Sequence, residues 1–271
     1  MITMNFEQQL RNLEYTYGNH DEAFLIALFS QVSDRYKVII NFNDEEHYLN
    51  IKNIEDNYYE WIDQDSYYRK ILKPDKYSDG MIEVNLQPRY SKEHRHTKEA
   101  IRTGDCAGIS SLWGCLSAID EEGLNEAYVA LNEWQFFNKY PPSLLVRCDD
   151  NMLYIFWCLE KFWKRSKNNI SQMNHFLAFF GCKLACYSKV FHFEPMNHYK
   201  LKRRINMPGT LRRRKKDSLY FTHICYFDVD TSEILPIDIA IDSPLLEVKR
   251  YPIESFFIEF GYDEFGKTEY D

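Results

Sequence analysis

The chain contains little glycine and proline, which account for 10 and 9 of its 271 residues. Aromatic residues make up 16% of the sequence and hydrophobic residues 45%. Such a composition excludes disorder as the general state and predicts a folded protein with a sizeable core. No apolar run approaches the ~20 residues that are needed to span a bilayer. The N-terminal segment also lacks the basic start and apolar centre of a signal peptide, so we expect a cytoplasmic protein without a membrane partner.

The seven cysteines form no even framework of the kind that disulfide-rich secreted proteins use. Because the chain starts like an intracellular protein, we expect reduced thiols, most of them buried.

Positive charge is scarce overall but concentrated in one segment. The chain has 33 Lys and Arg against 41 Asp and Glu, a net charge of −8. The segment Lys200–Lys216, KLKRRINMPGTLRRRKK, carries nine of the basic residues and no acid, and is called the basic strip below. Without it, 24 basic residues face 41 acidic ones, a net charge of −17. An acidic protein with one such segment is expected to bind an anion there, and a nucleic-acid phosphate backbone fits best. The plain alternative is a solvated charge run.

Apolar spacing and β-branched runs predict a mixture of helices and strands in one α+β domain. Helical spacing predicts two helices within 5–33, separated by a turn at 17–20, and further helices over 121–136 and 168–180. Strands are predicted over 36–42, 81–86 and 108–119, and hairpins from 143–147 to 152–159 and from 220–229 to 233–241. The polar stretch 43–80 is predicted to be a helix or loop excursion, and 261–271 an acidic tail.

Four motifs follow one another along the chain: VNLQPR at 84–89, SLWGCLS at 111–117, PPSLLV at 141–146 leading to YIFW at 154–157, and RINMPGT at 204–210. In this order and spacing they resemble the archaeo-eukaryotic primase (primase-polymerase) superfamily, in its plasmid and phage replication branch. The resemblance implies a mixed-sheet, RRM-like core over 81–245. It also implies helical N-terminal decoration over 1–80, which is part of the core or packed on it, and a C-terminal extension with the acidic tail over 246–271.

The same resemblance places the family's catalytic positions on residues that do not fit the chemistry. Its two metal-binding aspartates fall on Cys115 and Ser117, and its nucleotide-contacting histidine falls on Tyr154. No aspartate occurs between Asn151 and Lys216, where a third ligand is expected. Nucleotidyl transfer by this route needs two divalent cations held by carboxylates, and a thiol and a hydroxyl are poor ligands for Mg²⁺. We therefore expect no catalytic residues, no metal and no cofactor, and lean towards a protein that is not an enzyme.

The first hypothesis is a catalytically degenerate primase-fold protein that binds DNA or RNA. It would act as a non-catalytic factor in replication or in a mobile genetic element, alone or with a replication-protein partner. Counterion release would drive phosphate binding without reading sequence. The residues expected to bind nucleic acid are Arg203, Arg204, Thr210, Arg212, Arg213, Arg214, Lys215 and Lys216. Tyr154 is a further candidate for base stacking, although strand alternation favours a place in the core.

Two alternatives remain open. The first is an active primase-polymerase that uses Mg²⁺ or Mn²⁺ bound by relocated carboxylates, with Asp120, Asp149, Asp150 and Glu194 as candidates. The pair Asp228 and Asp230 matches an Asp-x-Asp pattern, but its position after the Pro-Gly-Thr turn predicts ordinary turn chemistry. The second alternative is a protein-interaction module in which the basic strip docks on an acidic partner.

Overall fold

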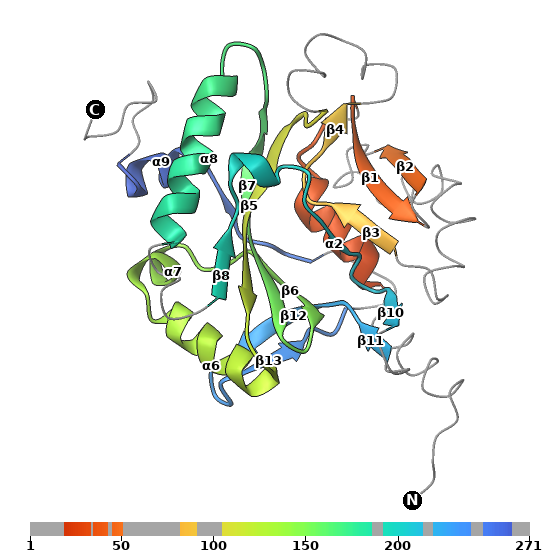
Figure 1. Cartoon of the computed structure of the whole chain (residues 1–271), viewed down its shortest axis with the longest axis vertical. Helices are drawn as coiled ribbons and strands as arrows, with labels where there is room; N and C mark the ends of the chain where they lie inside the picture. The colour runs from red at the N-terminus through yellow and green to blue at the C-terminus, as the bar shows by residue number, and fades with distance from the viewer. Residues whose placement is uncertain are drawn as a thin grey trace, which may run out of the picture.

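The computed structural model has an α+β fold built around two larger sheets, a mixed one and an antiparallel one (Figure 1). The structure describes residues 19–33, 35–42, 45–50, 82–90, 105–185, 192–213, 219–239 and 246–261. The predicted α+β class is confirmed, while the RRM-like core and the boundaries at 80 and 245 stay predictions. No helix within these ranges is long and apolar enough to cross a membrane.

The central sheet contains the strands that carry most of the sequence motifs. Its order is β13-β12-β6-β7-β5-β8, and β14 pairs in parallel with β7. All of its other pairings are antiparallel. The strands are β5 (Gly108–Ser117), β6 (Leu144–Asp149), β7 (Met152–Lys164), β8 (His192–Pro195), β12 (His223–Asp228), β13 (Glu233–Pro236) and β14 (Arg250–Tyr251).

A second sheet, the N-terminal sheet, has the order β2-β1-β3-β9, with β4 paired to β1. Its last strand comes from the basic strip, so residues far apart in sequence meet here. Its strands are β1 (Tyr36–Phe42), β2 (Glu45–Asn50), β3 (Ile82–Asn85), β4 (Arg89–Tyr90) and β9 (Arg204–Asn206). A separate ribbon pairs β10 (Leu211–Arg213) with β11 (Leu219–Phe221).

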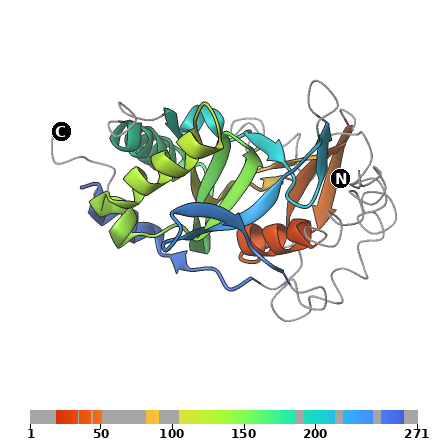
Figure 2. The same ribbon diagram turned by 90° about the horizontal axis from the view of Figure 1, so that it is seen from below.

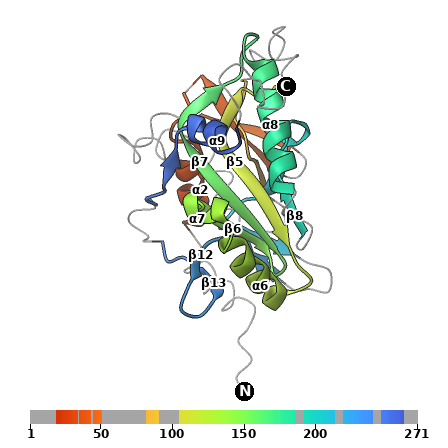
Figure 3. The same ribbon diagram turned by 90° about the vertical axis from the view of Figure 1, so that its left-hand side faces the viewer.

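The helices cover the central sheet on both sides. The helices α6 (Glu121–Asn132), α7 (Gln135–Lys139), α8 (Ile170–Ala185) and α9 (Ile253–Glu259) lie on one side, and α2 (His20–Phe29) with the N-terminal sheet lies on the other (Figures 1 and 2). Figure 3 shows the first group from its own side. The short 3-10 helix η4 (His198–Lys200) joins β8 to the N-terminal sheet.

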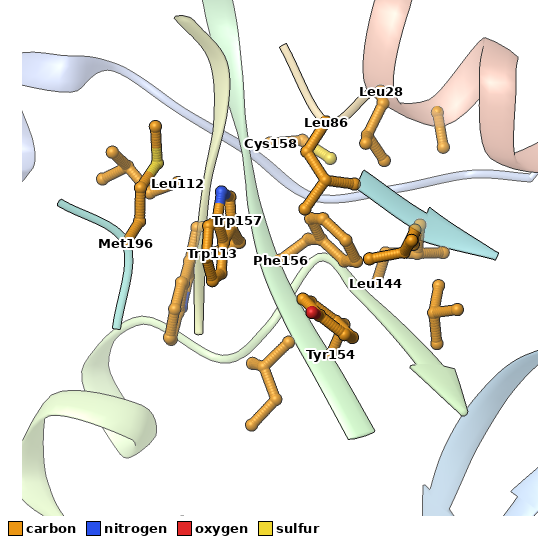
Figure 4. Close-up of a cluster of buried hydrophobic side chains, with 14 of the residues drawn as sticks. Leu28, Leu86, Leu112, Trp113, Leu144, Tyr154, Phe156, Trp157, Cys158 and Met196 are labelled. Carbon is orange, nitrogen blue, oxygen red and sulfur yellow. The ribbon is translucent and has the colours of Figure 1, made fainter. Parts of the chain in front are cut away.

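Both sides of the central strands are packed with aromatic residues. On the helix side, the ring of Trp157 lies 5.4 Å from that of Phe137 and 6.3 Å from that of Phe180, between centroids. On the other side, Phe24 of α2 meets Phe156 edge-on at 5.8 Å. Figure 4 shows the middle of this core, where Tyr154 and Phe156 of β7 lie beside Trp113 of β5. Burial of these large rings accounts for much of the stability of the fold.

Most predicted elements are confirmed. The strand 36–42 is β1, the run 108–119 contains β5, and both predicted hairpins form, as β6–β7 and β12–β13. The apolar residues that predicted α6 are the ones it buries, and α8 buries four of the five that predicted it, Ile170 being half-buried. Within the described part of the chain six cysteines are free, and all but Cys182 are buried.

Some predictions are wrong or fall elsewhere. Part of the stretch 43–80 is strand β2, which pairs with β1 alone among the described strands and whose polar sequence gave no β signal. The helix predicted over 121–136 ends at Asn132, and α7 begins after Trp134. The strand predicted over 220–229 is interrupted at Thr222. The first N-terminal helix and the acidic tail after Gly261 lie outside the described residues.

Candidate nucleic-acid interface

The strand register brings the family's catalytic positions together on one face of the central sheet. Cys115 of β5 lies opposite Tyr154 of β7 on one side and Glu194 of β8 on the other. Side chains of directly opposed residues share a face of the sheet. The position predicted for a metal-binding aspartate therefore lies beside the position of the nucleotide-contacting histidine and beside Glu194, one of the relocated carboxylates proposed above.

Cys115 and Tyr154 are neutral at neutral pH. Both side chains are 2% exposed, and burial raises the pKa of the Cys115 thiol to about 11. Burial likewise raises the pKa of the Tyr154 hydroxyl well above its ordinary value of 10. A neutral thiol binds a hard divalent cation poorly. Because Tyr154 is buried, its ring cannot stack on a base, which rules out the stacking role considered for it from the sequence.

Arg203 supplies the positive charge at this place. Its Nε donates to the Tyr154 hydroxyl at 2.8 Å, and its guanidinium carbon lies 5.9 Å from the centroid of the tyrosine ring. Within the described residues the two terminal guanidinium nitrogens, Nη1 and Nη2, have no hydrogen-bond partner. The pKa of Arg203 is raised further, burial opposing and the Tyr154 contact favouring the charged form. Arg203 is thus held in place by one nitrogen and retains donors for another anion.

Glu194 carries the acidic charge of this group and is already paired. Its carboxylate lies 2.5 Å from the Nζ of Lys200, on the turn of η4. Cys115, Tyr154, Glu194, Lys200 and Arg203 are called the cross-strand group below. It contains one carboxylate and two cationic side chains. Two divalent metal ions require several carboxylates instead. Across the described ranges no three His, Cys, Asp or Glu side chains come together in a way that could hold a metal.

The other candidate carboxylates are engaged in local structure. Asp120 caps α6, its Oδ1 accepting from the backbone N–H of Gly123 at 2.9 Å. Asp149 and Asp150 stand at the turn between β6 and β7, where Asp149 Oδ1 accepts from the N–H of Asp150 at 2.8 Å. Asp228 accepts from the N–H of Asp230 at 2.9 Å in the β12–β13 turn, the chemistry expected from the sequence. Of the candidate carboxylates, the strand pairings bring only Glu194 opposite Cys115.

The residues before the Pro-Gly-Thr turn point to different partners. Arg204 Nη2 donates to Glu46 of β2 at 3.2 Å, whereas Arg203 contacts Tyr154. Thr210 is 2% exposed, and its hydroxyl donates to the carbonyl oxygen of Met207 at 2.6 Å. The prediction that Thr210 contacts a phosphate is therefore wrong, because this hydroxyl closes the turn. Gly209 adopts a φ of 77°, which suits glycine at this bend.

The residues after the turn lead into the β10–β11 ribbon. The backbone of Arg212 and Arg213 lies in β10, opposite Tyr220 and Leu219. Arg214, Lys215 and Lys216 lie outside the described residues, in the connection between the two strands. In Figure 1 the ribbon stands at the opposite end of the molecule from α8 and α9. A two-stranded ribbon with a basic connection can approach a nucleic-acid backbone or a groove.

Two functional features could not be read directly from the sequence. Lys200 belongs to the basic strip, but its pairing with Glu194 depends on the turn of η4 and had no local signal. Tyr199 precedes the strip and is 84% exposed, an unusual state for so large a ring. Its position directly before a run of lysines and arginines was the sequence feature from which an exposed binding residue could have been predicted.

No family model and no curated protein match this chain. Two solved structures are similar to it. The AEP domain of the primase-polymerase of cyanophage S-2L has 8% identity and a TM-score of 0.39, covering 90% of this chain and 98% of that domain. The catalytic domain of primase RepB′, in complex with initiator DNA, has 8% identity and a TM-score of 0.37, covering 76% of this chain and 84% of that one. Both are described as primases, the class that the motifs resemble.

Proposed function

We propose that this protein is a degenerate member of the primase-polymerase class. It binds DNA or RNA through the basic strip and serves as a non-catalytic factor in replication or in a mobile genetic element. The observation that supports this best is the contact between Arg203 and Tyr154, directly opposite Cys115, where the family resemblance calls for a metal-binding carboxylate.

The loss of catalysis follows from the donor set. Two-metal nucleotidyl transfer needs convergent carboxylates around cations that lie ~4 Å apart. Cys115 and Ser117 stand where the family has aspartates, and Glu194 is neutralised by Lys200. A guanidinium beside these residues repels a divalent cation and attracts a phosphate.

Nucleic-acid binding follows from the distribution of charge. The basic strip places nine basic residues and no acid within seventeen positions of a sequence whose net charge is −8. Such a segment attracts polyanions against the repulsion of the rest of the protein. Affinity should therefore fall steeply with added salt, because each phosphate contact releases counterions.

The test combines a binding assay with an activity assay. Fluorescence anisotropy with labelled single- and double-stranded DNA and RNA should detect binding that weakens as salt is raised. Changing Arg212, Arg213 and Arg214 to glutamate should abolish this binding. Variants with one or two of these changes should show a salt slope that is smaller by about 0.9 for each phosphate that the protein no longer neutralises. Template-directed nucleotide incorporation should be absent with Mg²⁺ and with Mn²⁺.

A matched control separates the strip from total charge. Lys161, Lys164 and Lys167 are exposed around the end of β7, and changing them to glutamate alters the net charge by the same amount. This control should bind almost as well as the wild type. Template-dependent incorporation would refute the non-catalytic proposal in favour of relocated carboxylates. Binding of an acidic protein ligand but of no nucleic acid would favour the protein-interaction alternative.

A further inference from the structure

A groove of about 440 Å³ lies between α8, β8 and η4, and Glu194 and Lys200 of the cross-strand group form part of its wall. Its wall on α8 consists of small side chains, Ala178, Gly181, Cys182 and Ala185. A Cβ on Gly181 would lie 3.1 Å from the carbonyl oxygen of Met196, so glycine allows the β8–η4 segment to approach the helix. The small neighbours leave the hollow open. Its volume is in the range that holds a small planar ligand.

The rim of the groove offers an exposed aromatic face. Tyr199 lines the groove and is 84% exposed, and the ring of His198 lies 3.7 Å from it between centroids. A planar ligand can stack on a ring that is exposed in this way. Purine and pyrimidine bases have such faces.

Cations adjoin the groove where a phosphate backbone would pass. Lys202 is exposed on the turn that follows the groove, and the backbone N–H of Arg203 donates to the carbonyl oxygen of Lys200 at 3.0 Å. Lys200 itself lines the groove and is paired there with Glu194. The turn thus brings the start of the basic strip next to the exposed ring. Surfaces that bind single-stranded nucleic acids typically combine exposed aromatic rings with basic side chains.

We propose that this groove accepts one unpaired nucleobase stacked on Tyr199, which makes the protein prefer single strands. The inference rests on the proposed function, since it names the kind of nucleic acid that the basic strip holds. In a duplex both faces of each base are covered by neighbouring bases, so Tyr199 cannot stack on them and adds no affinity. Phosphate contacts alone would bind single strands and duplexes without this distinction.

Anisotropy titrations at one salt concentration test the proposal, with an oligothymidylate, a duplex of the same length and an abasic oligonucleotide as probes. Tyr199→Ala should weaken oligothymidylate binding about 5- to 150-fold, the range expected for one stacked base. Binding of the duplex and of the abasic strand should not change. Tyr199→Phe should keep the wild-type affinity, and Ala178→Leu, which fills the groove without altering charge, should weaken only oligothymidylate binding.

Tyr226→Ala is the matched control, because this tyrosine is 45% exposed on β12 and does not line the groove. It should leave all three affinities unchanged. If Tyr199→Ala binds oligothymidylate like the wild type while the Arg212–Arg214 reversal still abolishes binding, the base groove is refuted and the proposed function stands. If the wild type binds none of these probes and none of the RNA oligonucleotides used to test the proposed function, the proposed function fails and this inference fails with it.

Discussion

The cross-strand group and the later part of the basic strip differ in the residues that accompany their cationic side chains. In the cross-strand group, Arg203 and Lys200 are held by a buried tyrosine and by a carboxylate. Later in the strip, the sequence from Arg212 to Lys216 has five consecutive basic residues, and the next acid is Asp217. Under the proposed function, Arg203 brings a cation of the protein itself to the place that the sequence resemblance assigns to metal ions. Its positive charge adds to that of the neighbouring strip.

Electrostatics explains why the two regions are compatible. Guanidinium and ammonium groups at the cross-strand group would compete with bound metal ions, yet they extend the positive field that a phosphate backbone meets. Burial keeps Cys115 and Tyr154 uncharged, so neither opposes this field. The predictions below test whether the cross-strand group has become structural while the strip remains free to bind.

The largest effect is expected from restoring acids to β5. The double variant Cys115→Asp and Ser117→Asp should lose about 3–5 kcal/mol of unfolding free energy without metal, because position 115 is buried beside Glu194. Saturating Mn²⁺ should return part of this loss, since a metal that binds only the folded state stabilises it. Urea unfolding with and without Mn²⁺ measures both quantities.

The neutral double variant Cys115→Asn and Ser117→Asn is the control for this experiment. It changes shape in a similar way without adding charge, so Mn²⁺ should not stabilise it. If Mn²⁺ stabilised the wild type as much as the acidic variant, the cross-strand group would bind a metal ion without added acids. That result would contradict the claim that its cations now exclude metal.

A smaller effect is expected from Tyr154→Phe, which removes the acceptor of the Arg203 Nε–H. A hydrogen bond to a charged group contributes about 1.5–3 kcal/mol, so the free energy of unfolding should fall by that amount. Tyr128→Phe serves as the reference, because Tyr128 is 3% exposed and its hydroxyl makes no hydrogen bond among the described residues. Equal losses in the two variants would show that Tyr154 does not anchor Arg203.

Much of the fold could be predicted because hydrophobic periodicity is local. The strand β5 follows from an unbroken small and apolar run, and α8 follows from apolar residues at helical spacing. Strand β2 could not be predicted in the same way, because a strand that pairs with β1 alone among the described strands needs few apolar residues. Its sequence, EEHYLN, has the polar character of a loop.

The site was harder to predict because its members meet through non-local pairing. Cys115 and Tyr154 could be located by motif, but Glu194 joins them only through the β5–β8 register. Strand alternation could have separated Arg203 from Arg204, which contact different sheets. The exposure of Tyr199 depends on the 3-10 turn at 198–200, and helical or strand periodicity gives no indication of it.

Electron paramagnetic resonance of Mn²⁺ titrated into the wild-type chain tests the central claim most directly. Arg203 and Lys200 beside one paired carboxylate should leave the Mn²⁺ signal that of the free ion. Stoichiometric uptake of Mn²⁺ that disappears in Glu194→Gln would contradict this account, because it would show that the cross-strand group still binds the metal of a polymerase.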